Sequence, residues 1–192
     1  MRLASGILLG VLGASLGALW ANEKTVGIAS MPGAGVPMHA AWHEVKWPFP
    51  LDEWGTGHAF RCEASDCGGG IDLYLRAKVG FCNCTTGVSD NADLDRVSDI
   101  ELYSETFRGL TDGHAVDVGR LKGRSRLYHV TIPYAAPRDI LAIAFNDQCD
   151  VAVATVAADG ERLANTEALA LDFLKSDPVQ RWARAELGQS GL

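Results

Sequence analysis

Residues Leu3 to Ala21 contain no charged side chain, and they directly follow Arg2. A basic start, an apolar run and small residues near a cleavage point form the pattern of a secretory signal peptide. The pattern predicts cleavage after Ala21, with cleavage after Ala18 as the alternative. Left uncleaved, a run of this length approaches the ~20 residues that span a bilayer, and residues 3–21 would then anchor the chain in a membrane. Both interpretations place the remainder outside the cytoplasm, in the periplasm if the host is Gram-negative.

That location determines how the five cysteines are interpreted. Cys62, Cys67, Cys82 and Cys84 lie within 23 residues, whereas Cys149 stands apart. Cysteines that are close together in an exported protein are typical of disulfides, so we expect the four to pair among themselves and Cys149 to be left over. Their connectivity stays open, with a Cys82–Cys84 bridge least favoured. The alternative is a copper or zinc site, because thiolates bind both metals.

Length and charge narrow the classes of protein further. The chain has 192 residues, of which 47% are hydrophobic, enough for one sizeable core. Its net charge of -7 argues against a nucleic-acid partner, because such proteins gain most of their affinity from cations that neutralise phosphates.

The order of the expected elements predicts the fold class. Residues 57–61 and 71–79 have strand patterns on either side of a glycine-rich turn, and a helix is expected from about residue 90 to 104. Further strands are expected over 116–118, 120–132, 141–145 and 151–157, the last two joined by a turn at Asn146 and Asp147. Two helices follow, one over 167–174 capped by Thr166 and one over 178–187 capped by Asp177. We therefore predict an α+β fold: a mostly antiparallel sheet, one helix between strands and two C-terminal helices packed on the sheet.

The chain before the sheet is rich in proline, glycine and aromatic residues. We expect residues 22–53 to be irregular and residues 54–192 to form a single domain. Trp47, Phe49 and Trp54 either cover one edge of the core, as large aromatic side chains usually do, or form a surface for a partner.

A second candidate binding surface is basic. Arg120, Lys122, Arg124 and Arg126 alternate, so a strand would place all four cations on one face. This basic stripe could meet an anionic partner. It could equally be a solvated face that is balanced by carboxylates of the preceding helix, which are Asp90, Asp93, Asp95 and Asp99.

Other motifs are weak. His39 and His43 have a spacing that would let a helix present both to a metal, but no third ligand accompanies them. No catalytic nucleophile and base can be paired by sequence, and no cofactor motif is recognised. We therefore expect an exported domain that binds a protein of the envelope or a membrane complex, as an accessory or assembly factor. The alternative is a thiol-based metal carrier or redox protein that uses the four clustered cysteines.

Overall fold

The computed structural model describes residues 41–159 and 163–188. The expected leader, His39 and the first part of the segment 22–53 lie outside the described residues. Within the segment 22–53, which is expected to be irregular, Trp42–Val45 forms an edge strand against residues 59–62.

The described elements are strands, three longer helices, one helical turn (α1) and one 3-10 helix. In chain order they are β1 (Trp42–Val45), β2 (His58–Cys62), α1 (Ala64–Cys67), β3 (Ile71–Lys78), α2 (Asn91–Val97), η1 (Ile100–Leu102), β4 (Phe107–Gly109), β5 (His114–Val118), β6 (Leu121–Val130), β7 (Arg138–Asp147), β8 (Asp150–Ala158), α3 (Leu163–Leu174) and α4 (Asp177–Glu186).

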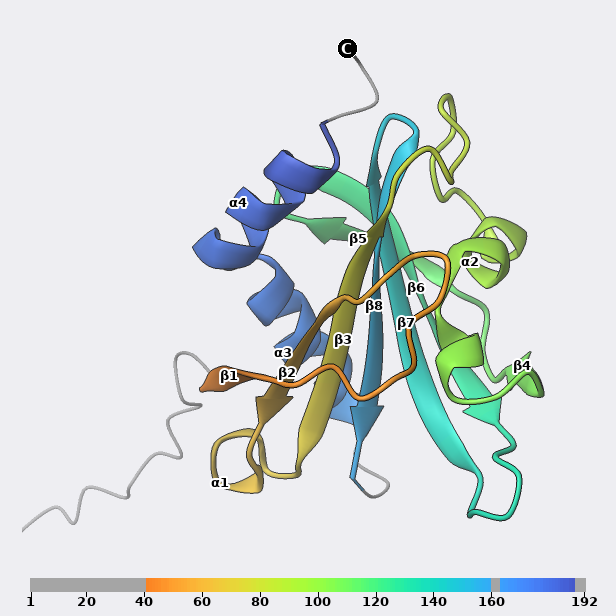
Figure 1. The fold of residues 1–192 in the computed structure, drawn as a ribbon, viewed down its shortest axis with the longest axis vertical. Helices are drawn as coiled ribbons and strands as arrows, with labels where there is room; N and C mark the ends of the chain where they lie inside the picture. The colour runs from red at the N-terminus through yellow and green to blue at the C-terminus, as the bar shows by residue number, and fades with distance from the viewer. Residues whose placement is uncertain (1–40, 160–162, 189–192) are drawn as a thin grey trace, which may run out of the picture. The chain divides into compact units, whose positions relative to one another are not determined.

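The strands form one eight-stranded antiparallel sheet in the order β1-β2-β3-β8-β7-β6-β4, with β5 also paired to β6. The ribbon in Figure 1 shows α3 and α4 on one side of the sheet and α2 on the other. The predicted α+β fold, with one helix between strands and two C-terminal helices, is confirmed. No helix of residues 41–159 and 163–188 has the length and apolarity needed to cross a membrane.

Each face of the sheet carries its own hydrophobic core. Leu73, Ile143 and Phe145 lie on the face covered by α3 and α4, where they pack near Leu174 and Ala183. The opposite face is closed by α2 and η1. Its core residues, which come from the sheet, α2 and η1 and include the fully buried Tyr128, are Leu94, Val97, Ile100, Tyr128, Val130, Ile140 and Val153.

Several boundaries differ from those predicted, for local reasons. The expected helix 90–104 is broken because Ser98 is extended, so α2 ends at Val97 and a 3-10 turn follows. The β7–β8 connection turns at Gln148, whose φ is 50°, rather than at Asn146 and Asp147. Helix α3 begins at Leu163, which places Thr166 inside it, and Ser176 is the residue that precedes α4.

A strap of residues 46–57 joins β1 to β2 and crosses the front of β3 (Figure 1, orange). It approaches the strand so closely at Gly57 that an added Cβ would lie 2.5 Å from the Leu75 carbonyl oxygen and 2.7 Å from the Trp47 ring. Glycine removes that clash. The strap therefore rests directly on the α2 side of the sheet.

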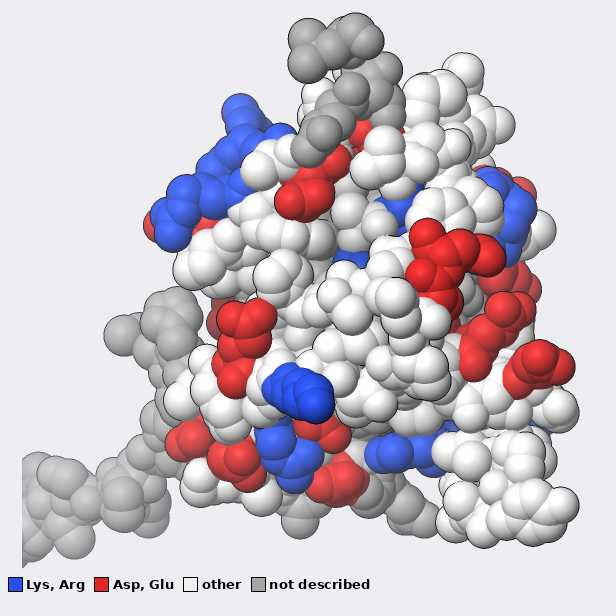
Figure 2. Space-filling model, viewed as in Figure 1, with Lys and Arg blue, Asp and Glu red and all other residues white. Residues whose placement is uncertain are grey.

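Figure 2 shows the charge distribution on the same side of the molecule. Basic side chains gather over α4, which carries the exposed Arg181 and Arg184, and acidic side chains gather over the α2 side. Uncharged surface lies between them.

Candidate functional site

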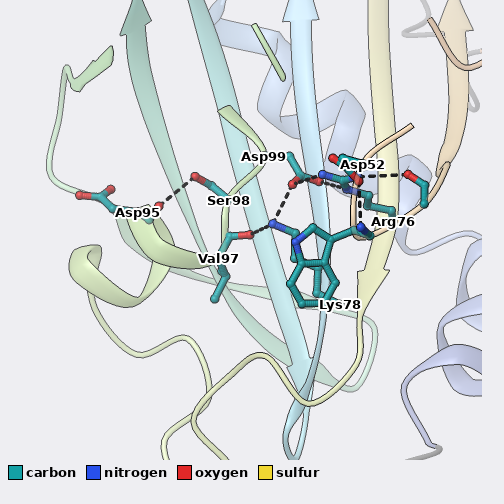
Figure 3. Close-up of polar contacts among 9 residues, drawn as sticks. Asp52, Arg76, Lys78, Asp95, Val97, Ser98 and Asp99 are labelled. Carbon is teal, nitrogen blue, oxygen red and sulfur yellow. Dashed lines mark hydrogen bonds and ion pairs between the residues drawn. The ribbon is translucent and has the colours of Figure 1, made fainter. Parts of the chain in front are cut away.

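Four charged side chains form a network between the strap and the sheet, which we call the charge clamp: Asp52, Arg76, Lys78 and Asp99 (Figure 3). Arg76 Nε and Nη2 donate to the two Asp99 oxygens at 2.6 and 2.8 Å, and Nη1 donates to both Asp52 oxygens at 2.8 Å. Lys78 Nζ lies 2.7 Å from Asp99 Oδ1 and donates to the Val97 carbonyl at 2.8 Å. The clamp thus ties the strap and the α2–η1 segment to β3.

The pKa shifts agree with tight pairing. Burial acts to raise the pKa of Asp52, but hydrogen bonds from Arg76 and from the Trp54 amide outweigh it, so the pKa lies below its usual value. Burial likewise acts to lower the pKa of Arg76, and the hydrogen bonds and charges of Asp99 and Asp52 overcome it and raise the pKa. The charged forms are therefore the stable ones.

Aromatic rings complete this side of the site. Lys78 Nζ lies 5.4 Å from the Trp54 ring centre and 5.5 Å from that of Phe81, and Arg76 lies over the Trp47 ring. The cavity here measures about 320 Å³ and is bordered by the clamp. Because each clamp charge is already paired within the chain, the clamp is a structural tie and leaves no free charge for a ligand.

The aromatic pocket lies on the opposite face, between β1–β2 and the C-terminal helices. It measures about 310 Å³, and its walls come from β1, β2, β3, α3 and α4. The lining residues are Trp42, Glu44, His58, Phe60, Leu75, Phe173, Pro178, Val179 and Trp182. The rings contact one another, with Phe173 centred 4.8 Å from both Trp42 and Phe60, and Trp182 5.8 Å from His58. A mostly apolar cavity with a few polar groups is the usual form of a binding site.

One polar pair accompanies these rings. Glu44 Oε1 lies 2.8 Å from His58 Nδ1, and both side chains are about half exposed. Sequence reasoning pairs His58 with nothing, because the two residues come together only through the β1–β2 ladder. The pocket as a whole was missed for the same reason, since its walls come from distant parts of the chain.

The cysteines pair differently from the expectation. The disulfides are Cys62–Cys67 and Cys84–Cys149, and Cys82 is the free, buried thiol. The expectation that Cys149 is left over is wrong, because the β7–β8 turn brings it to the loop that carries Cys84. The thiol-based metal carrier is overturned too, since the disulfides occupy three of its four proposed cysteines.

The free thiol of Cys82 has low reactivity. Burial raises the pKa of Cys82, and the charge of Asp150 raises it further. Its Sγ donates to the Gln148 carbonyl at 3.2 Å. A thiol with a raised pKa is a poor nucleophile at neutral pH.

Most side chains of the basic stripe form ion pairs or hydrogen bonds with other groups of the chain. Lys122 pairs with Asp117 at 2.6 Å, and Arg126 donates to both Asp95 oxygens, at 2.9 and 3.0 Å. Arg124 hydrogen-bonds Asn91 at 2.9 Å and two backbone carbonyls. Arg120, just before β6, has no hydrogen bond or ion pair among the described residues. A partner role for the stripe stays a prediction.

The four carboxylates expected to balance this stripe have separate tasks. Asp90 caps α2 by accepting from the Asp93 amide at 2.8 Å, and Asp93 in turn accepts from Ser89. Asp95 pairs with Arg126, while Asp99 belongs to the charge clamp. Only one of the four therefore contacts the stripe directly.

The aromatic residues of the strap pack on the chain itself. Trp47 and Phe49 make edge contacts with Tyr74, at 5.9 and 4.8 Å between ring centres, and Trp54 lies 4.6 Å from Phe81. These contacts correspond to the edge-covering alternative. Whether the same residues also meet a partner stays a prediction.

The histidine pair gains no support. His43 lies on a strand, 3.7 Å from Glu63, so the helical spacing that suggested a shared ligand face does not apply to it. Within residues 41–159 and 163–188, no group of three or more His, Cys, Asp or Glu side chains is placed to hold a metal ion.

A smaller cavity of about 190 Å³ lies between the sheet and α3. His114 Nε2 lies 3.0 Å from Glu167 Oε1 there, and Ser125 faces the same cavity across the β5–β6 ladder. The Ser125 hydroxyl is buried and has no hydrogen-bond partner among the described residues, His114 included.

No family model matches the chain, and no curated protein sequence matches it either. Among solved structures, the chain is similar to the solution structure of cyanobacterial PsbP (CyanoP) from Synechocystis sp. PCC 6803. The two share 14% identity over 69% of this chain and 78% of that chain, with a TM-score of 0.42. A likeness at this level assigns no family and no function.

Proposed function

We propose that the chain is an extracytoplasmic domain that acts by binding, as an accessory or assembly factor of an envelope or membrane complex. The aromatic pocket is the observation that carries this proposal. It is a partly open cavity lined by two tryptophans and two phenylalanines, and aromatic rings in such cavities contribute much of the energy of protein recognition.

Two features support the location. The expected leader directs the chain out of the cytoplasm, and two disulfides are typical of proteins in oxidising compartments. A cleaved leader would leave a periplasmic domain in a Gram-negative host, whereas an uncleaved one would hold the domain at the membrane.

We place recognition at the aromatic pocket rather than at the basic stripe or the strap. Arg124 and Arg126 already hydrogen-bond groups of the chain, and Trp54 already covers Lys78. Side chains that are committed to internal contacts would have to give these up to meet a partner. The rings of the aromatic pocket border an open cavity instead.

The test is co-migration in envelope extracts solubilised with a mild detergent. The wild-type chain is expected to migrate on a native gel with a much larger complex. Trp182→Leu, which removes one pocket wall, is expected to migrate alone. Trp54→Leu is the matched control, because it changes a tryptophan on the other side of the sheet, and it should still co-migrate. Circular dichroism confirms that each variant is folded. A wild-type chain that migrates alone contradicts the proposal.

A further inference from the structure

The aromatic pocket combines aromatic rings with the carboxylate of Glu44 and the imidazole of His58, and its lining contains no lysine or arginine. Glu44 uses Oε1 for the contact with His58, and its second oxygen has no hydrogen-bond partner among the described residues. A cation near several rings and a carboxylate is attracted by both, because the ring faces carry partial negative charge. The pocket therefore has the electrostatic character of a site for a cation.

The other side of the sheet shows the same combination already filled. There, Trp54 and Phe81 lie within 5.5 Å of Lys78 Nζ, and Asp99 pairs with that ammonium. Arg76 likewise lies 5.8 Å from the Trp47 ring centre while it pairs with carboxylates. The chain thus supplies its own cations to the aromatic and acidic cluster under the strap. In the aromatic pocket the lining residues include no lysine or arginine.

We infer that the aromatic pocket receives one arginine side chain of a protein partner. This rests on the proposed function, in which the pocket is the recognition site. Arginine fits better than lysine, because its planar guanidinium stacks on aromatic rings and forks onto a carboxylate. Its apolar stem contacts the rings, and its charge meets the free oxygen of Glu44.

The experiment follows the indole N–H signals of Trp42 and Trp182 by NMR while the purified protein is titrated with a small probe. The probe is N-acetyl-arginine amide, and N-acetyl-citrulline amide is its control, since citrulline has the same shape without the charge. We expect citrulline to bind about tenfold more weakly, because it loses the cation–ring attraction and the carboxylate contact.

Two variants locate the charge that matters. Glu44→Gln keeps the shape of the side chain and should weaken arginine binding while leaving it stronger than citrulline binding, because the cation–ring attraction remains. Glu105→Gln alters an exposed carboxylate away from the pocket and should leave both affinities unchanged. Shifts confined to other residues would place the probe elsewhere and overturn the inference.

The outcomes separate this inference from the proposed function. Equal binding of the two probes, or no shift at 50 mM arginine probe, overturns the arginine site while co-migration of the wild-type chain with a complex still stands. If Trp182→Leu co-migrates with the complex as the wild type does, the pocket is not the recognition site, and the inference is overturned with it.

Discussion

Arg76 and Asp99 meet side by side in the buried α2 face of the sheet, with two parallel contacts of 2.6 and 2.8 Å. Their side chains are 5% and 4% exposed. Charges at that depth are tolerated only when they are paired, because removing an ion from water costs several kcal/mol. The pair therefore fixes the α2–η1 segment on β3.

Asp99→Ala tests this pairing. The substitution leaves Arg76 and Lys78 buried with less compensation, and we expect the free energy of unfolding to fall by ~3–5 kcal/mol. Urea denaturation at neutral pH measures the change. Asp112→Ala, at an exposed aspartate without a partner among the described residues, should change it by less than ~0.5 kcal/mol. A small effect at Asp99 would show that the pair does not hold the segment.

The ion pair of Asp52 makes the free energy of unfolding decrease at acid pH. Its pKa is lower in the folded state than its usual value, so the stabilisation is fully present above the usual aspartate pKa. It is lost as the pH falls through the lowered pKa of the folded state. The free energy of unfolding of the wild type and of Asp52→Asn is measured by denaturation between about pH 6 and about pH 2. The difference between the two should be constant near pH 6 and should shrink as the pH approaches about 2. A difference that does not change with pH would contradict the ion pair with Arg76.

The disulfide pairing can be read by mass. Protein from its own compartment should be four hydrogens lighter than the reduced chain and should contain one thiol that reacts only after unfolding. Peptide mapping should link Cys84 to Cys149. Cys149→Ala should lower the free energy of unfolding by ~2–5 kcal/mol, because the cross-link over a long loop is lost. Cys82→Ala should cost less, and a peptide linking Cys82 to another cysteine would contradict the assignment.

In strand β3 the sequence pattern predicts one feature correctly and another wrongly. Alternation along residues 71–79 correctly predicts a strand whose apolar residues, such as Leu73 and Leu75, are buried. The same pattern predicts that Arg76 and Lys78 face solvent, and this is wrong. Both are buried because Asp52 in the strap and Asp99, just before η1, reach them, which no local pattern can indicate.

The aromatic pocket could not be predicted from the sequence for a related reason. No local sequence pattern shows that Trp42 and Trp182 line one cavity with Phe60 and Phe173. That proximity depends on β1 pairing with β2 and on α3 and α4 folding back over the sheet.

The proposal that the aromatic pocket recognises a partner is tested most directly by photo-crosslinking in living cells. Benzoylphenylalanine replaces His58, which lines the pocket, or Arg108, an exposed residue on β4 that serves as the control position. We predict a light-dependent adduct of one defined mass from position 58, none from position 108, and loss of the adduct when Trp182→Leu is added. Identical adducts from both positions, or none from position 58, would contradict a binding site in the pocket.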